Sequence, residues 1–334
     1  MGILKDKYGR IHNYLRVSLT DMCNLNCSYC NPEGADFKHT PKFELLTYEE
    51  TQRLISIFVR DLNFNKIRLT GGEPLVRKNI ETFFTSLNLI KKEYPFKLGI
   101  TTNGLLLKNK IDILKENGID YLNISLDTLN KEQFRKITGS DSLSSVLEAI
   151  DCAVNKGFKS VKINTVVMKN LNTNEIPDFL RYVEKYGINI RFIEYMPFSG
   201  NGWNKDYFIS MKEIINIVKS YADITPISNN EASVAKDYIV KGSNVKVSFI
   251  SSISDDFCSD CNRLRITSDG HLKLCLFSNL SDEINLKKYV RDSGFSDSDI
   301  AEIIRSSLLE KKLKHPEIDE LLKANKNNMF RIGG

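Results

Sequence analysis

Six of the seven cysteines in this chain fall into two groups of three, an arrangement that indicates metal binding rather than a disulfide framework. The first group, Cys23, Cys27 and Cys30, has the spacing C-x3-C-x2-C. Three thiolates on one loop can hold three irons of a cubane cluster and leave the fourth iron open to an added chelate. A structural zinc site would need a fourth ligand, and only His39 lies near in sequence. The spacing therefore predicts an open [4Fe–4S] cluster.

The second group, Cys258, Cys261 and Cys275, again supplies only three sulfurs, with the spacing C-x2-C-x13-C. Zinc and a second open iron–sulfur cluster are both compatible with this spacing, because His271 could complete a zinc site. The seventh cysteine, Cys152, matches neither group and is expected to pack within a buried helix face.

Cations recur on one face of several expected strands. Arg16, Arg68 and Lys162 each alternate with apolar neighbours, so that their strands have one polar and one apolar face. The apolar face must lie under helices, which turns the cations toward the interior of a barrel. Arg263 and Arg265 stand one residue apart beside the second cysteine group, and paired guanidiniums suit phosphate oxygens. An internal ion pair or a solvated edge would explain any one of these residues, but the set predicts an anionic substrate.

The elements that must position these residues form a regular series. Strands are expected at residues 14–20, 66–70, 97–102, 121–127, 160–168 and 189–196, and helices at 47–62, 80–93, 108–117, 142–155 and 175–186. This alternation predicts βα units and a parallel sheet. A closed barrel of this kind has eight units, so six predict an α/β fold with an incomplete, TIM-like (β/α)6 barrel. We expect a core domain at residues 1–198 and a C-terminal extension at 199–334 that covers the open side.

The composition predicts a soluble, cytoplasmic, globular protein. Hydrophobic residues make up 41% and charged residues 27%, which is enough apolar material for a sizeable core. No apolar run approaches the ~18 residues that would span a bilayer, and the first residues lack the apolar core of a secretory signal. The net charge of +5 does not require nucleic acid, which usually meets a far more basic surface. We therefore expect no membrane partner and no nucleic-acid partner.

Further motifs surround the first cysteine group. Tyr29 stands directly before Cys30, and the sequence Thr-Gly-Gly-Glu-Pro at 70–74 ends the second expected strand. Together with Asn-Ile-Ser-Leu-Asp at 123–127, these features resemble the radical S-adenosylmethionine (SAM) superfamily, whose partial barrel the predicted fold would share. The resemblance implies that SAM chelates the open iron. The residues that it implies as SAM contacts are Tyr29, Gly72, Ser125 and Met196.

Stretches along nearly the whole chain resemble one family within that superfamily, the GTP 3′,8-cyclases, which begin molybdenum-cofactor biosynthesis. They include Tyr-Leu-Arg-Val-Ser-Leu-Thr-Asp at 14–21, Arg-Phe-Ile-Glu-Tyr-Met at 191–196 and the terminal Gly333-Gly334. By this resemblance the two glycines would thread into a crowded pocket and assist catalysis. The residues that would bind GTP are Arg16, Arg68, Thr101, Lys162, Arg263, Leu264 and Arg265.

The same resemblance implies a chemistry and a set of partners. The enzyme would be a lyase with two [4Fe–4S] clusters, one at each end of the barrel, and the second open iron would bind guanine. A 5′-deoxyadenosyl radical from SAM would take hydrogen from C3′ of GTP, and C3′ would then attack C8. No side chain is expected to act as acid or base. A monomer or homodimer would use a reductant such as flavodoxin or ferredoxin and hand its product to a cyclic pyranopterin monophosphate synthase.

Two positions depart from the family pattern, and two other functions stay open. Asn31 stands where the family commonly has Met, and Asn79 where it commonly has Asp; neither is a cluster ligand. A radical SAM peptide maturase with an auxiliary cluster would usually carry more C-terminal cysteines and would not need a cationic barrel. A zinc-stabilised nucleic-acid-binding protein would be colourless, and its binding would depend on salt.

Overall fold

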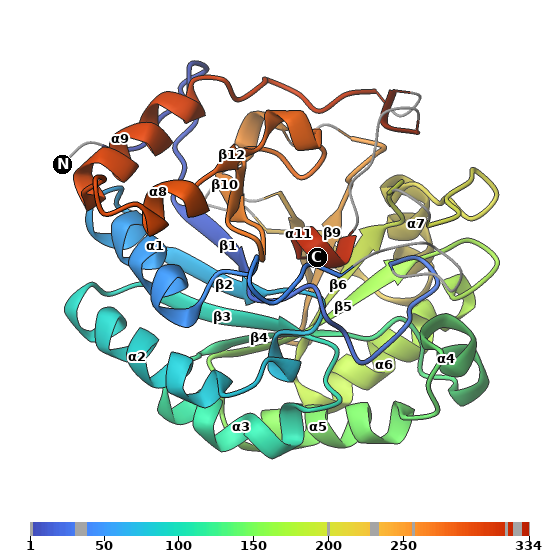
Figure 1. The fold of residues 1–334 in the computed structure, drawn as a ribbon. Coiled ribbons are helices and arrows are strands. Elements are labelled where there is room, and N and C mark those ends of the chain that lie inside the picture. The colour runs from blue at the N-terminus through green and yellow to red at the C-terminus, as the bar shows by residue number, and fades with distance from the viewer. Residues whose placement is uncertain are drawn as a thin grey trace.

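A parallel β-sheet with helices on its outer face forms the centre of the computed structural model, which describes residues 3–30, 39–198, 201–227, 234–255, 258–317, 320–322 and 329–333 (Figure 1). Its first six strands are β1 (Tyr14–Ser18), β2 (Lys66–Thr70), β3 (Lys97–Thr102), β4 (Tyr121–Ser125), β5 (Ser160–Val167) and β6 (Asn189–Glu194). The helices between them are α1 (Tyr48–Arg60), α2 (Ile80–Glu93), α3 (Leu107–Glu116), α4 (Lys131–Thr138), α5 (Leu143–Asn155) and α6 (Ile176–Tyr186). All six expected strands and all five expected helices are confirmed, with small differences at their ends.

Helix α4 was not expected from the sequence. The side chain of its N-cap, Asn130, accepts a hydrogen bond from the backbone N–H of Gln133 at 3.0 Å, and Gly139 ends the helix with a φ of 71°. This short helix buries few side chains, among them Phe134 and Ile137. The helix is therefore too short for its pattern of hydrophobic residues to be recognised in the sequence. Its capping residues, Asn130 and Gly139, were recognisable signals.

The C-terminal region contributes the remaining elements. Its strands are β7 (Ile224–Pro226), β8 (Lys236–Val240), β9 (Lys246–Ile250), β10 (Arg263–Ile266), β11 (His271–Lys273) and β12 (Ile284–Asn285). Its helices are α7 (Met211–Tyr221), α8 (Lys287–Arg291), α9 (Asp297–Leu308) and α11 (Met329–Ile332), and the 3-10 turns of the chain are η1 (Pro74–Val76), η2 (Thr173–Glu175), η3 (Cys258–Asp260) and η4 (Leu280–Asp282). None of the helices in the described ranges has the length and apolar composition needed to cross a membrane.

The C-terminal region extends the sheet at both ends. Among the described residues the strand order is β12-β11-β10-β1-β2-β3-β4-β5-β6-β9-β8-β7. β10 pairs parallel with β1 and β9 pairs parallel with β6, whereas the outermost strands pair antiparallel. β12 and β7 form the two ends of this order, so the sheet stays open. The predicted incomplete α/β barrel is thus confirmed, while the domain boundary at residues 198 and 199 stays a prediction.

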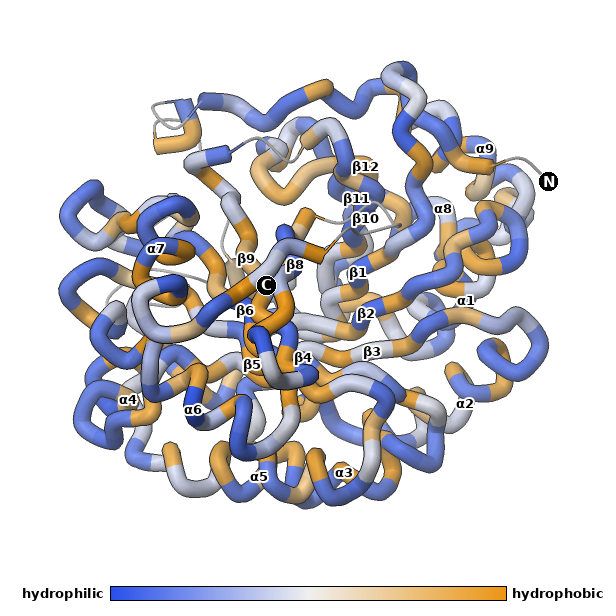
Figure 2. Tube along the Cα trace, turned by 180° about the vertical axis from the view of Figure 1, so that it is seen from behind, coloured by the Kyte–Doolittle hydropathy of each residue, from blue (hydrophilic) through white to orange (hydrophobic). Residues whose placement is uncertain are grey.

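Alternation along the strands explains how the sheet is buried. Leu15 and Val17 of β1 are fully buried in the main hydrophobic core, and Arg16 between them faces the opposite side. The outer helices cover the apolar side, and in Figure 2 they carry both hydrophobic and hydrophilic segments, as amphipathic helices do. Thr47 and Glu50 form a capping box at the start of α1. The polar side chains of the central strands therefore face the interior of the barrel.

Candidate active site

The turn after β2 is pressed against the loop that carries the first cysteine group. The backbone N–H of Gly72 donates to the carbonyl of Thr20 at 2.7 Å, and that of Glu73 donates to the carbonyl of Met22 at 2.8 Å. A Cβ atom at Gly71 would lie 2.6 Å from the Thr20 oxygen, and one at Gly72 would collide with the Met22 oxygen. From the resemblance, Gly72 was expected to contact SAM. The structure shows that Gly71 and Gly72 first make room for the cysteine loop itself.

Glu73 connects this turn to the end of β3. Its buried carboxylate accepts hydrogen bonds from the Thr102 hydroxyl at 2.8 Å and from the backbone N–H of Asn103 at 2.7 Å. Burial raises the pKa of Glu73 to about 7 in spite of these hydrogen bonds. The side-chain nitrogen of Asn103, Nδ2, donates to Asn24 Oδ1 at 2.8 Å and lies 3.7 Å from Cys23 Sγ. Neither Glu73 nor Asn103 was expected at the site, although Glu73 follows the two glycines of the motif at 70–74.

The thiols of the first group lie close enough to influence one another. Burial and then the neighbouring charges of Cys30 and Asp127 raise the pKa of Cys27 well above its usual value. Burial and the charge of Cys23 raise the pKa of Cys30 to about 12. Within the described residues, no three His, Cys, Asp or Glu side chains are grouped as ligands of one metal ion.

Tyr29 is held at the carboxyl end of the sheet. Its hydroxyl donates to Asp127 Oδ2 at 2.6 Å, and Asp127 Oδ1 accepts from the backbone N–H of Val166 at 2.8 Å. Burial raises the pKa of Asp127 to about 6. Ser125 ends β4 and Met196 follows β6, so both stand at this same edge with Tyr29 and the turn after β2. The structure therefore brings the four expected SAM contacts to one end of the barrel, where βα enzymes carry their sites.

The second cysteine group lies among basic residues. Burial alone would raise the pKa of Cys261, but the charges of Lys311 and Arg263 lower it. His271, the candidate fourth zinc ligand, has its Nδ1 atom 3.3 Å from Asp269 Oδ1 and belongs to no ion-binding group in the described part of the chain. None of the seven cysteines, all of them within the described residues, forms a disulfide. Cys152 is half-buried on α5 against the main core.

The strand pairing separates the two cysteine groups. Cys23 and its partners follow the carboxyl end of β1, whereas Cys258 and Cys261 precede the amino end of β10. β10 runs parallel to β1, with Tyr14 opposite Arg263. The two groups therefore lie at opposite ends of these strands, whose length is roughly 15 Å at about 3.3 Å per residue. The inner face of the sheet lies between them.

A row of arginines crosses this inner face. Arg265, Arg16 and Arg68 stand side by side in register on β10, β1 and β2, and each is only 6–7% exposed. Burial and the charge of Arg265 hold the pKa of Arg16 well below its usual value. Burial and the charge of Arg263 lower the pKa of Arg265 to about 10. Arg68 Nε donates to the Tyr14 hydroxyl at 2.8 Å. A bound anion would relieve the mutual repulsion of these cations.

Further polar side-chain atoms of the inner face have no hydrogen-bond partner among the described residues. These buried atoms are Arg191 Nε, Arg263 Nε, Thr101 Oγ1, Asn164 Oδ1 and Ser248 Oγ. Lys162 on β5 is half-buried, and its pKa is held well below the usual value by burial and by the charge of Arg191. Buried polar atoms are nearly always hydrogen-bonded in native proteins, so this face fits a polar ligand. Arg191 was not assigned a role, although it alternates with apolar neighbours as the other cations do.

Leu264 differs from the other expected GTP contacts. Its side chain is fully buried in the hydrophobic core on the outer face of β10, between Arg263 and Arg265. Successive strand residues face opposite sides of a sheet. Only the main chain of Leu264 is therefore available to a ligand on the inner face.

The C-terminal tail reaches the same region. The carbonyl of Gly333 accepts a hydrogen bond from Arg265 Nη1 at 2.6 Å. Gly333 has a φ of +72°, and a Cβ atom there would collide with the hydroxyl of Thr70. The tail thus contacts both the arginine row and the end of β2, in line with the threading that the resemblance implies. Gly334 and Asn31 lie outside the described residues.

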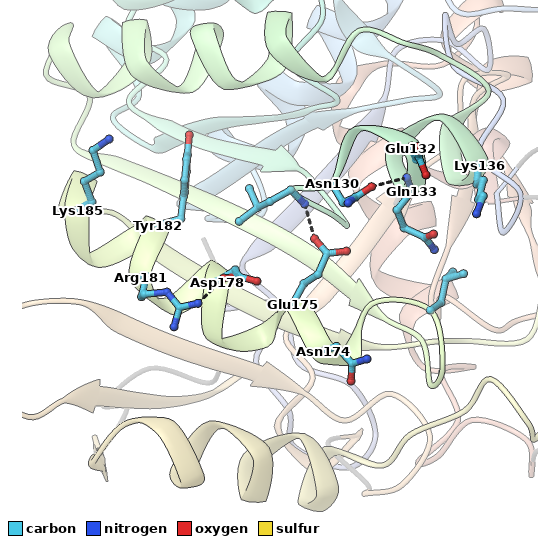
Figure 3. Close-up of a pocket in the computed structure, with 12 residues that line it drawn as sticks. Asn130, Glu132, Gln133, Lys136, Asn174, Glu175, Asp178, Arg181, Tyr182 and Lys185 are labelled. Carbon is cyan, nitrogen blue, oxygen red and sulfur yellow. Dashed lines mark hydrogen bonds and ion pairs between the residues drawn. The ribbon is translucent and has the colours of Figure 1, made fainter.

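Two cavities of the molecule lie apart from the arginine row. One of about 770 Å³ lies between α4 and α6 on the outside of the sheet (Figure 3). Part of its charged lining is internally paired, because Arg181 bonds to Asp178 and Glu175 accepts from the segment before α4. A second cavity of about 410 Å³ includes Cys275 and Lys311. The first cavity contains none of the expected site residues, so its size does not mark the site.

Comparison with known proteins identifies the class and then the family. Two family models match: the radical SAM superfamily over residues 17–183, and Molybdenum Cofactor Synthesis C over residues 188–317. Molybdenum cofactor biosynthesis protein 1 of Dictyostelium discoideum is 44% identical over 99% of this chain, which spans only 52% of that relative. GTP 3′,8-cyclase of Clostridium botulinum is 41% identical over 98% of this chain and 99% of its own length. The chain belongs to the radical SAM superfamily and, within it, to the GTP 3′,8-cyclase family.

A solved structure supports the fold. Streptococcus suis SuiB bound to S-adenosylmethionine matches with a TM-score of 0.65 over 96% of this chain and 77% of SuiB, at 14% identity. At that identity the likeness concerns the fold alone, an open α/β barrel. Membership of the superfamily implies one [4Fe–4S] cluster and SAM, for which the first cysteine group is the candidate site.

We expect Gly72→Ala to weaken the first metal site, because the added methyl group would collide with Met22 and displace the cysteine loop. Overpacking of this kind costs roughly 1–3 kcal/mol. The free energy of unfolding and the iron bound after anaerobic reconstitution should both fall.

Gly294→Ala is the matched control, because Gly294 also lacks a left-handed φ and its nearest neighbour is the exposed side chain of Asp292. If Gly72→Ala and Gly294→Ala have the same iron content and the same free energy of unfolding, the close contact between Gly72 and Met22 does not support the metal site.

Proposed function

We propose that this chain is a GTP 3′,8-cyclase, a lyase that converts GTP to (8S)-3′,8-cyclo-7,8-dihydroguanosine 5′-triphosphate in the first step of molybdenum cofactor biosynthesis. The observation that carries the proposal is the buried cationic inner face between two cysteine groups at opposite ends of one sheet. A triphosphate supplies the negative charge that such a face requires. The name of the clostridial relative, which this chain matches over almost its full length, supports the reaction type.

The proposed cofactors are SAM and two [4Fe–4S] clusters. The thiols of the first cysteine group influence one another's pKa, which fits a shared cluster. The second group lies beside Arg263 and Lys311, whose charges favour a thiolate at Cys261. With three thiolates each, both clusters would keep one iron that the protein does not ligate. When bound, the first cluster and SAM supply a radical able to take a hydrogen atom from the substrate.

The residues of the chain itself bind and orient GTP. Arg16, Arg68 and Lys162 would hold the triphosphate by charge-assisted hydrogen bonds from the inner face. The second cysteine group, at the other end of the strands, would hold the guanine. Fixing both ends of one nucleotide places its C3′ hydrogen and its C8 atom between the two metal sites, and such positioning can supply much of a rate enhancement. The tail around Gly333 would cover this space and exclude water.

Arg263→Ala and Lys162→Ala should each weaken GTP binding and leave SAM binding unchanged. A hydrogen bond to a charged group contributes about 1.5–3 kcal/mol, so we expect the Kd for GTP to rise about tenfold or more. Anaerobic calorimetric titration measures both ligands. Arg181→Ala, an exposed arginine on α6, is the control. Unchanged GTP affinity in both inner-face variants would remove these residues from the site.

Deleting Gly333 and Gly334 should abolish cyclisation while both clusters remain, because the tail contacts the arginine row without contributing a cysteine. Iron analysis and product formation by mass spectrometry check the two parts of this prediction. Full activity in the truncated protein would make the tail irrelevant to the reaction.

The direct test is an anaerobic incubation of the purified protein with GTP, SAM and dithionite, followed by mass analysis. We expect 5′-deoxyadenosine and a cyclised nucleotide, and a brown protein with about eight irons per chain if both sites hold cubanes. Zinc in place of iron, together with salt-dependent binding of nucleic acid, would instead support the zinc-stabilised alternative. Cleavage of SAM without any change in GTP would also contradict the proposal.

A further inference from the structure

A hairpin near the N-terminus orients one arginine toward the second cysteine group. Lys5 and Ile11 form an antiparallel bridge, and Asp6 lies buried inside the hairpin. The Asp6 carboxylate accepts from the backbone N–H groups of Tyr8 at 2.9 Å and Arg10 at 3.0 Å, and from Arg10 Nε at 2.5 Å. These contacts fix one edge of the Arg10 guanidinium.

The other edge of the Arg10 guanidinium joins two segments that are distant in sequence. Nη1 donates to the carbonyl of Cys258 at 2.7 Å and to that of Leu313 at 2.9 Å, and Nη2 donates to the carbonyl of Lys312 at 2.8 Å. Arg10 is only 9% exposed. A planar guanidinium can hold one carboxylate and several carbonyls together, whereas an ammonium group is a point charge on a flexible stem.

Lys311 continues this connection to the third cysteine. Its ammonium group donates to the carbonyl of Leu274, which directly precedes Cys275, and to the carbonyl of Arg263 at 3.4 Å. Residues 311–313 are therefore tied to the Cys258 loop through Arg10 and to Cys275 through Lys311. One buried network spans both parts of the second cysteine group.

We infer that Arg10 is a positioning residue for the second metal site, because it fixes the loop of Cys258 and Cys261 relative to Cys275. The inference rests on the proposed function, since it takes the three thiols as one ligand set. Arg10 itself would not touch the metal; it acts through main-chain carbonyls. The hairpin, which contains none of the cysteines, thereby becomes part of the structure that holds the second cluster.

The test replaces Arg10 by lysine in the full chain, which keeps the charge and removes the fork. We expect Arg10→Lys to lose the electron paramagnetic resonance signal of the second cluster and to bind about half the iron of the wild type. The signal of the first cluster and SAM cleavage should persist. Equal loss of both clusters would indicate general unfolding and would overturn the inference.

Arg53→Lys is the matched control. Arg53 also joins a carboxylate, that of Asp297, to two carbonyls of the C-terminal region, those of Val290 and Phe295. It contacts none of the cysteines in these interactions. We expect Arg53→Lys to keep both cluster signals, so that loss of the second signal in both variants would show that any weakened C-terminal contact has the same effect.

A second measurement uses metal-free protein, so that it does not depend on cluster chemistry. Cys258 is 6% exposed. In reduced, metal-free Arg10→Lys its alkylation by iodoacetamide should be faster by about tenfold than in wild type or Arg53→Lys, because the loop opens more often. Equal rates in the two variants would contradict the inference.

A variant with Cys258, Cys261 and Cys275 all changed to alanine separates the two proposals. If it keeps the full iron content of the wild type, the second cluster is absent and both the proposed function and the role of Arg10 fail. If it loses about half the iron while Arg10→Lys loses none, only the role of Arg10 is overturned.

Discussion

The main physical constraint on this structure is a set of positive charges that are buried side by side on one face of the sheet. Arg265, Arg16 and Arg68 occupy neighbouring strands in register. Burial, and then the charges of neighbouring arginines, lower the pKa of Arg16 and of Arg265. The same strands stabilise the arrangement from the other side, where Leu15 and Val17 lie in the apolar core. Burial alone would raise the pKa of the Tyr14 hydroxyl, but the charge of Arg68, with those of nearby arginines, holds it well below the usual value. The barrel thus combines an apolar outer layer with an inner face whose arginines repel one another, and a bound anion would reduce that repulsion.

Close backbone packing at the carboxyl end of the sheet complements this constraint. The loop of the first cysteines rests on Gly71 and Gly72, and the buried Glu73 links that turn to β3. On the other side of the loop, the backbone N–H of Asn26 donates a hydrogen bond to the carbonyl of Thr138, at the end of α4, at 3.1 Å. Contacts from two different βα units, those that follow β2 and β4, therefore hold this loop in place.

Much of this arrangement follows from local patterns. The alternation in β1 and β2 already turns Arg16 and Arg68 inward, and the spacing of Cys23, Cys27 and Cys30 indicates the kind of metal group. The long-range facts do not follow. Nothing in the sequence indicates that Arg10 contacts the main chain of Cys258. That Arg191 Nε lacks a hydrogen-bond partner is equally hidden, because it depends on which strands lie beside β6. That β9 and β10 extend the two edges of the six-stranded core was equally invisible, because pairing between strands that are distant in sequence has no local signal.

The position of β9 and β10 also affects how the chain folds during synthesis. Until they emerge, β1 and β6 are edge strands whose unpaired N–H and C=O groups are exposed, a state that favours aggregation. β1, near the start of the chain, acquires its neighbour β10 only after residues 263–266 have left the ribosome. A nascent chain that has not yet made its last third therefore carries two sheet edges that the finished protein covers.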